Sequence, residues 1–182
     1  MDKKYDALIE KFPRMFGKNA RFSMIIDCGP GWYSIISLLC ENIDYHVAHA
    51  REMRVWHLLK NRALIRAHRA NDPDILRRFF RKRYLDFDES WISDRVEKEF
   101  GNAPAPLPSG CKKVVIQQAK EKFGTLRFYV RGGDDTVHGM IQMAESMSSV
   151  ICEQCGRPGY ADGQWIKTKC AICHNLLFPE PQ

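Results

Sequence analysis

Hydrophobic residues recur at helical spacing through the first hundred residues of the chain. They predict a helix over residues 2–12, which Pro13 ends, and a second helix that follows the Gly29-Pro-Gly31 turn and runs from Trp32 to about residue 43. A third helix is predicted over residues 51–70, with apolar residues on one face and arginines on the other. The first part of the chain is therefore expected to be mainly helical.

Local signals at Asn71, Asp72 and Asp88 place two more helices. Asn71 ends the third helix, and Asp72 followed by Pro73 is a typical helix start. Leu76, Phe80 and Tyr84 would form the apolar side of this fourth helix. Asp88 is expected to cap a fifth helix that extends to residue 100, and a proline-rich loop over residues 101–110 separates these helices from the C-terminal part of the chain.

The period changes from helical to alternating between residues 113 and 131. Apolar and polar residues alternate there, which predicts two strands joined by a bend near residues 122–124, with a third strand expected over residues 22–26. A final helix over residues 136–150 leads directly to Cys152. We therefore predict an α+β fold that is mostly helical, with a small antiparallel hairpin or sheet and a C-terminal zinc-ribbon-like module.

Four cysteines near the C-terminus carry the clearest chemical signal. Cys152 and Cys155 form one C-x₂-C pair, Cys170 and Cys173 form another, and 14 residues separate the pairs. This pattern favours a tetrahedral zinc site, although the separation is one residue shorter than is usual for zinc ribbons. His174 is an alternative ligand, but four thiolates already complete the shell. A closed shell leaves no position for substrate, so we expect a structural Zn²⁺ ion.

Disulfides, a redox pair and buried thiols are the competing interpretations of these cysteines. The N-terminus lacks the apolar segment of a secretory signal, and the longest apolar run, residues 33–40, is too short to cross a membrane. We therefore expect a cytoplasmic protein with reduced cysteines and no membrane association. A redox pair would leave the other two cysteines unexplained.

The positive charge of the chain is concentrated in residues 51–83. The net charge of the whole chain is +6, whereas this stretch holds 11 Lys and Arg against three acidic residues, a local charge of +8. Residues 84–99 follow with six acidic and two basic residues, and either pair with the basic stretch or are solvated. The candidate binding residues for nucleic acid or a protein partner are Arg51, Arg54, Arg62, Arg66, Arg69, Arg77, Arg78, Arg81 and Lys82, together with Arg127, Tyr129 and Arg131 on one face of the predicted hairpin.

Three stretches resemble a family of small, functionally unassigned proteins encoded by tailed bacteriophages and prophages. They are residues 31–40, residues 119–129 with the string Lys-Glu-Lys-Phe-Gly-Thr-Leu-Arg-Phe-Tyr, and residues 139–147 running into the first cysteine pair. The resemblance implies an α+β core over residues 1–45 and 112–151 and a zinc-binding module over residues 152–182. Residues 46–111, which hold the basic stretch, would be a helical insertion specific to this chain.

No catalytic motif is recognisable, and we expect a binding protein more than an enzyme. The six histidines form no metalloprotease motif, and no nucleophile elbow or phosphate-binding loop is present in the sequence. Asp88 and Asp134 are better explained as helix caps than as metal ligands.

We therefore expect a non-catalytic phage accessory protein that binds nucleic acid, or a host protein that handles nucleic acid, through its basic helices. The alternative is an inhibitor of a host defence system, which would bind a protein with Trp56 or Trp91 as anchors or sequester a nucleotide signal.

Overall fold

The computed structural model describes residues 3–17, 25–162 and 166–177, which divide into two compact units. Unit 1 consists of residues 1–48 and 111–182, and unit 2 consists of residues 49–110. The part of the predicted third strand over residues 22–24 lies outside the described residues. Unit 1 contains α1 (Lys3–Lys11), α2 (Pro13–Phe16), β1 (Ile26–Asp27), a 3₁₀ turn (Pro30–Trp32), the first part of α4 (Tyr33–Ala70), β2 (Val115–Lys122), β3 (Thr125–Arg131), α7 (Asp135–Ser148), β4 (Tyr160–Asp162), β5 (Lys167–Lys169) and α8 (Ala171–Leu177).

The main sheet of unit 1 is mixed rather than purely antiparallel. Strands β2 and β3 form the predicted hairpin, whose turn contains Phe123 and Gly124 at positive φ. Strand β1 lies on the other side of β2 and pairs with it in parallel, with Ile26 opposite Ala119. A parallel pair needs a long crossover, and the chain between β1 and β2 supplies one through α4 and unit 2. The predicted antiparallel hairpin is therefore present, and the third strand, whose direction the sequence left open, makes the sheet mixed.

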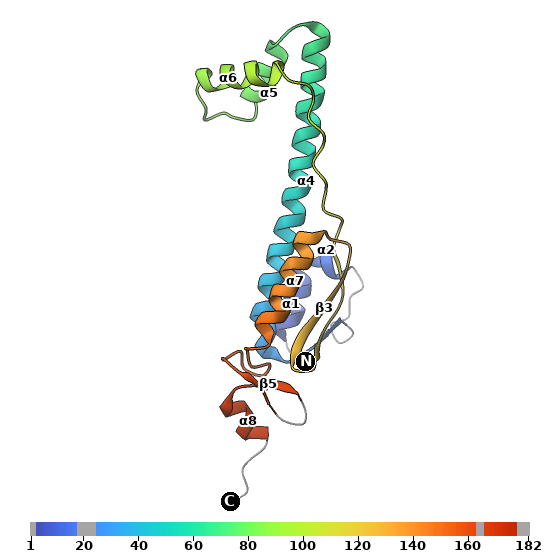
Figure 1. Cartoon of the computed structure of the whole chain (residues 1–182), viewed down its shortest axis with the longest axis vertical. Coiled ribbons are helices and arrows are strands. Elements are labelled where there is room, and N and C mark those ends of the chain that lie inside the picture. Colours follow the sequence, from blue (N-terminus) through green and yellow to red (C-terminus); the bar gives the residue numbers. More distant parts are fainter. Residues whose placement is uncertain (1–2, 18–24, 163–165, 178–182) are drawn as a thin grey trace, which may run out of the picture. The chain divides into compact units, whose positions relative to one another are not determined.

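Helix α7 covers the outer edge of β3. The backbone N–H of Leu126 donates to Ser148 Oγ at 2.8 Å, and the N–H of Phe128 donates to Glu145 Oε1 at 2.9 Å. Figure 1 shows α7 lying alongside β3. These side chains satisfy edge donors that would otherwise be open to pairing with another strand.

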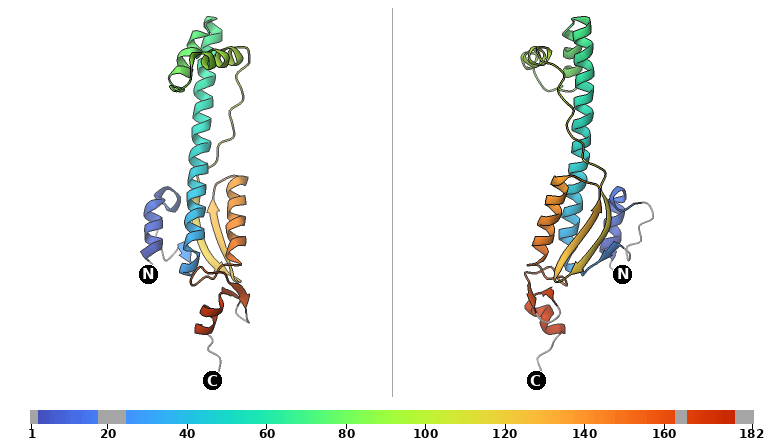
Figure 2. Two further views of the ribbon diagram at one scale, coloured as in Figure 1. Left: turned by 90° about the vertical axis from the view of Figure 1, so that its left-hand side faces the viewer. Right: turned by 45° about the vertical axis from the view of Figure 1, so that its right-hand side comes forward.

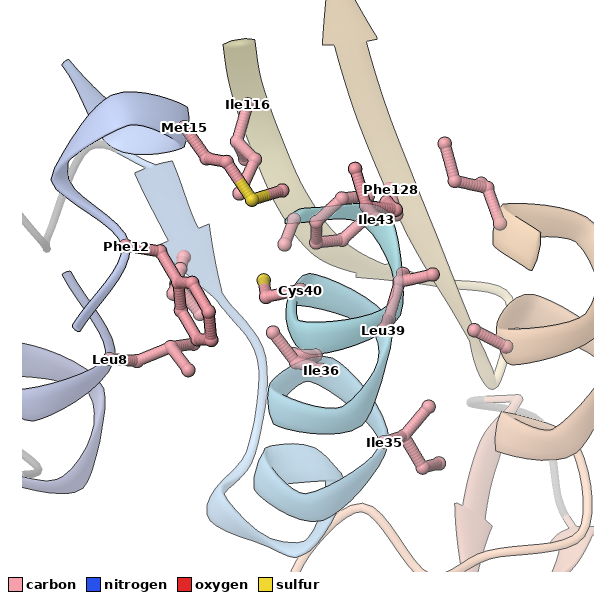
Figure 3. Close-up of a cluster of buried hydrophobic side chains, with 14 of the residues drawn as sticks. Leu8, Phe12, Met15, Ile35, Ile36, Leu39, Cys40, Ile43, Ile116 and Phe128 are labelled. Carbon is pink, nitrogen blue, oxygen red and sulfur yellow. The ribbon is translucent and has the colours of Figure 1, made fainter. Parts of the chain in front are cut away.

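The core of unit 1 forms around the first turns of α4. In Figure 3, Ile36 and Cys40 face Leu8 and Phe12, on the side of α1, whereas Ile43 lies beside Phe128 of β3. All of these side chains are buried. The predicted second helix thus packs through its apolar stripe, as expected from its spacing.

The second and third predicted helices are one continuous helix. Helix α4 runs for 38 residues without interruption, so the prediction of two separate helices was wrong. The joining segment, residues 44–50, contains no glycine or proline that would break a helix. Val47 packs partly against the core of unit 1, and the periodicity simply continues through it.

Unit 2 packs the end of α4 against α5 (Asp74–Arg81) and α6 (Glu89–Phe100), which lie side by side in Figure 2. Asn71 ends α4 at φ 49°, Asp72 Oδ1 accepts from the N–H of Asp74, and Asp88 caps α6 by accepting from the N–H of Trp91. The ends at Asn71 and Asp88 confirm the predicted signals. Helix α5 instead begins one residue after Pro73 and ends at Arg81, so Tyr84, predicted on its apolar side, lies beyond it. The unit has its own core of Trp56, Leu64, Ala67, Leu76, Phe80, Ile92 and Val96.

The proline-rich segment of unit 2 runs along α4 as an extended chain (Figure 1). Asn61 Nδ2 donates to the carbonyl of Ala105 at 2.6 Å, and Arg54 Nη1 donates to the carbonyl of Pro108 at 2.8 Å. Two α4 side chains thus hold a segment that forms no ladder or helix hydrogen bonds of its own.

Candidate metal centre and basic groove

The four predicted cysteine ligands meet in one cluster in unit 1. The sulfur atoms of Cys152, Cys155, Cys170 and Cys173 all lie within 4.8 Å of one another, and Cys155 alone is exposed. The first pair lies in the turn after the Ile151 bridge, and Cys173 lies in the first turn of α8, directly after the small β4–β5 sheet. The structure therefore brings two sequence-distant pairs together.

The spacing of these sulfurs fits a metal ion better than a disulfide. The sulfurs of Cys155 and Cys170 are 3.6 Å apart, far beyond the roughly 2.05 Å of a disulfide bond. A tetrahedral zinc ion with bonds of about 2.3 Å places its sulfurs about 3.8 Å apart. The four cysteines can therefore hold a metal ion.

The clustered thiols change one another's pKa in opposite directions. Burial opposes ionisation of Cys152, but backbone N–H groups of Cys170, Cys155 and Gln154 point at its sulfur and lower its pKa to about 6. Cys173 shows the opposite effect, because Cys155 and the other thiols beside it raise its pKa to about 12. A cluster that ionises first at one sulfur and resists further negative charge is one that a divalent cation stabilises.

Glu153, inside the first cysteine pair, anchors the cysteine module (residues 151–177) to the rest of unit 1. Its Oε1 accepts from the N–H of Gly29 at 2.9 Å, and its carbonyl accepts from the N–H of Gly31 at 2.7 Å. Its other carboxylate oxygen lies 3.6 Å from Lys167 Nζ, and its side chain is 8% exposed. Sequence reasoning missed Glu153, because a glutamate between two cysteines carries no signal of burial.

The Gly29-Pro-Gly31 turn is the docking surface for the first cysteine pair. A Cβ at Gly31 would lie 2.2 Å from the carbonyl oxygen of Cys152, so only glycine fits. Beside it, Trp32 is fully buried and its indole N–H donates to the carbonyl of Ile151 at 2.8 Å. On the hairpin side, the buried Thr168 donates its hydroxyl to the carbonyl of Gly124 at 2.6 Å. The module is thus fixed at two separate points of unit 1.

The basic residues of unit 2 surround a groove of about 710 Å³ between α4 and α5. Its apolar lining comes from the exposed Leu59 and from Ala63, Ile75 and Phe79, which are half-buried. Five cations and no acidic residue complete the lining. The basic groove consists of Leu59, Arg62, Ala63, Arg66, Ile75, Arg78, Phe79, Arg81 and Lys82.

The structure separates the predicted basic residues into free and paired groups. Arg62, Arg66 and Arg69 are exposed on α4, and within the described parts of the chain they make no ion pair. Arg77 and Arg81 instead form ion pairs with Glu89 of α6, at 2.7 and 2.6 Å. The hydrogen bonds from these arginines lower the pKa of Glu89, and the larger effect comes from Arg81. The acidic stretch after residue 84 therefore neutralises part of α5 and Lys60 of α4, which pairs with Glu99 at 2.6 Å, and leaves the three exposed arginines of α4 uncompensated.

The remaining predicted binding residues lie in less favourable positions. Arg78 lies 3.6 Å from Asp72, Arg54 holds the proline-rich segment, and Arg51 and Lys82 are exposed. On β3, Arg127, Tyr129 and Arg131 share the face opposite the buried Leu126 and Phe128, as predicted. Arg127 lies 3.7 Å from Glu145, and Lys120 lies over the ring of Tyr129, so this platform is already partly occupied by neighbouring side chains.

The two tryptophans considered as protein-binding anchors lie within the packing of unit 2. Trp56 is 9% exposed and belongs to its core, because it shares a buried face of α4 with Leu64 and Ala67. Trp91 is half-buried against Tyr84 and Phe87. Trp56 is therefore largely covered within unit 2, and a role for either tryptophan in binding a protein partner stays a prediction.

Comparisons of the chain with protein-family models, curated proteins and solved structures gave no match. In the described part of the chain, no helix is both long enough and apolar enough to cross a membrane.

Proposed function

We propose that the protein binds nucleic acid through the basic groove of unit 2. The observation that carries this proposal is the groove lining: five arginine and lysine side chains around an apolar floor, with no carboxylate among them. Nucleic-acid phosphates attract such a surface because binding releases condensed counterions. Guanidinium groups add charge-assisted, bidentate hydrogen bonds to phosphate oxygens.

The unpaired arginines of α4 would make the principal phosphate contacts. Arg62, Arg66 and Arg69 follow one another at spacings of four and three residues and so lie along one face of the helix. Phe79 and Ile75 offer an apolar surface beside them on which an unpaired base would rest. Such a combination suits single-stranded nucleic acid, in which backbone and bases are accessible together.

The cysteine module would hold a structural Zn²⁺ ion. Four thiolate donors with no further ligand from the described residues match a closed tetrahedral shell, which favours zinc over harder cations. The ion would fix the turn that carries Glu153 and thereby the contacts with Gly29 and Gly31. In this proposal the protein is a non-catalytic accessory factor of a phage or prophage, the setting implied by its family resemblance.

A second candidate function is the sequestration of a nucleotide signal in the same groove. The specific observation in its favour is the groove's volume of about 710 Å³, which lies within the range of small-ligand sites. A nucleotide would place its phosphates among the arginines and its base against Phe79. This candidate predicts tight binding of a small nucleotide, whereas nucleic-acid binding predicts affinity that rises with oligonucleotide length.

Fluorescence anisotropy with labelled oligonucleotides tests the proposal directly. Single-stranded DNA, single-stranded RNA and duplex DNA are each titrated at several salt concentrations, with an acidic polypeptide and a set of mononucleotides and cyclic dinucleotides as competitors. The proposal predicts an affinity for at least one nucleic acid that falls steeply with salt. Absence of binding to all three nucleic acids at low salt would contradict it, and tight competition by a small nucleotide would favour the second candidate.

A further inference from the structure

Three potential metal ligands outside the cysteine module meet at a second place in unit 1. His46 lies on α4, Cys111 follows the proline-rich segment, and Asp134 precedes α7. One donor atom from each side chain lies within 4.8 Å of the other two, and all three residues are half-buried. They are separated by 65 and 23 residues in sequence, so their meeting is a product of the fold.

The contacts within this cluster centre on the carboxylate of Asp134. Its Oδ2 lies 2.9 Å from His46 Nε2, and its Oδ1 lies 3.2 Å from the same nitrogen. Oδ1 also accepts from the N–H of Val137 at 3.1 Å, which is the cap of α7. The sulfur of Cys111 lies within 4.8 Å of a carboxylate oxygen of Asp134. One carboxylate oxygen thus caps the helix while the other faces the imidazole.

The arrangement does not fit a Cys-His-Asp nucleophilic triad. In such a triad the histidine bridges the thiol and the carboxylate. Here His46 Nε2 bonds to the carboxylate, and among the described residues His46 forms no hydrogen bond with Cys111, so the histidine does not bridge the two. A shared electropositive centre explains three convergent donors better than a nucleophile does.

We propose that His46, Cys111 and Asp134 form a second site, which binds a divalent transition metal ion of the Zn²⁺ class. Imidazole, thiolate and carboxylate are all ligands of zinc, at about 2.0–2.3 Å. In a tetrahedron such bonds separate the donors by about 3.3–3.8 Å, so the observed spacing needs shifts of about 1 Å or less at each donor. Three protein ligands leave a fourth position for water or an anion, unlike the closed shell of the four cysteines.

The positions of the ligands in the sequence suggest what the ion would do. His46 lies three residues before His49, where unit 2 begins, and Cys111 directly follows Gly110, where unit 2 ends. The ion would therefore join the two connections to unit 2 and link both to the start of α7. This inference does not depend on nucleic-acid binding, and either proposal can fail alone.

Metal stoichiometry in reduced protein tests the second site. Apo protein is reconstituted with Co²⁺ or Zn²⁺, dialysed, and analysed for metal content, with thiolate-to-cobalt absorption recorded in parallel. Wild-type protein should hold about two equivalents, and Cys111→Ser and His46→Ala should each lose about one while retaining the absorption of the four-cysteine site. Cys28→Ser, which alters a half-buried thiol outside both clusters, should retain both equivalents.

Two results would overturn the second site. One is a wild-type content of about one equivalent at saturating metal, which would leave His46 and Asp134 as an ordinary ion pair that caps α7. The other is a variant content equal to that of wild type. Circular dichroism of Cys111→Ser separates loss of the site from loss of the fold, because the substitution removes only the sulfur donor.

Discussion

The ligands of the cysteine module follow from local spacing in the sequence, whereas the charge of the basic groove depends on tertiary neighbours. The four cysteines come in two short pairs, and the structure places all four sulfurs in one cluster. The basic residues form an equally conspicuous stretch, but ion pairs with Glu89 occupy Arg77 and Arg81, while Arg62, Arg66 and Arg69 stay exposed. A ligand set is therefore defined by its own spacing, whereas a charged surface is defined by which neighbours neutralise it.

Among the tests of this comparison, loss of the metal should have the largest effect on the structure. The variant Cys152→Ser, or treatment with a strong chelator, should unfold the cysteine module, because metal binding contributes on the order of 10 kcal/mol to comparable sites. Hydrogen exchange should show lost protection at the N–H of Gly31, which donates to the carbonyl of Glu153 across the docked turn, and at the N–H of Glu153, which donates to the carbonyl of Thr168 within the module. Amides in the core helices of unit 2 should keep their protection, as should all of these amides in Cys28→Ser. Unchanged protection after chelation would contradict the structural role of the metal.

The fit of the docking turn gives the next largest effect. Gly31→Ala should lower the free energy of unfolding by about 3 kcal/mol, because the added methyl would collide with the carbonyl of Cys152. Gly139→Ala is the matched control. Gly139 lies exposed within α7, and the added carbon would have no atom within 4 Å beyond the adjoining backbone of its own helix. This substitution should stabilise the protein by about 0.5–1 kcal/mol. Equal effects in chemical denaturation would show that the turn is not tightly docked.

Metal retention should depend on pH through the first thiol to ionise. The pKa of Cys152 falls from 9.0 to about 6, so its thiolate stabilises the metal-free module fully above about pH 9 and loses that contribution as pH falls through 6. Protons compete with the metal for the same sulfur, and we therefore expect release of the ion below about pH 6. A colorimetric assay of released zinc measures this, and full retention at pH 4 would contradict the assignment.

Substitution on the ion-paired side of α5 should change the affinity for nucleic acid least. Arg77 contacts Asp74, Glu89 and Ser93, and it does not line the groove. Arg77→Ala should therefore produce a small decrease in melting temperature, since exposed ion pairs contribute little, and almost no change in the affinity for nucleic acid. A large loss of affinity in this variant would place the binding surface on the α5–α6 side.

Sequence periodicity predicted most elements of the fold but not the links between them. Asn71, Asp88 and the Phe123-Gly124 turn act through local backbone preferences, and each is visible in the sequence. The continuity of α4 was missed because residues 44–50 contribute only Val47 to the apolar stripe, although they contain no helix breaker.

Long-range contacts explain what sequence reasoning could not find at the candidate sites. The buried carboxylate of Glu153 accepts from the N–H of Gly29, 124 residues earlier in the chain, and lies beside Lys167 on the next part of the module. Asp134 was explained as a helix cap, which is confirmed, but nothing local indicates that His46 and Cys111 meet there. Such clusters depend on tertiary packing, which periodicity and spacing in the sequence do not indicate.

The salt dependence of nucleic-acid binding tests the central claim most directly. The triple variant Arg62→Ala, Arg66→Ala, Arg69→Ala is compared with wild type by anisotropy across a salt series. The matched control is Lys112→Ala, Lys113→Ala, Arg157→Ala, which removes the same charge from exposed positions in unit 1. If all three arginines contact duplex phosphates, the slope of log K against log salt should become shallower by about 2.7, or by about 2.1 for a single strand, with the control near wild type. Equal slopes in wild type and the arginine variant would contradict the account.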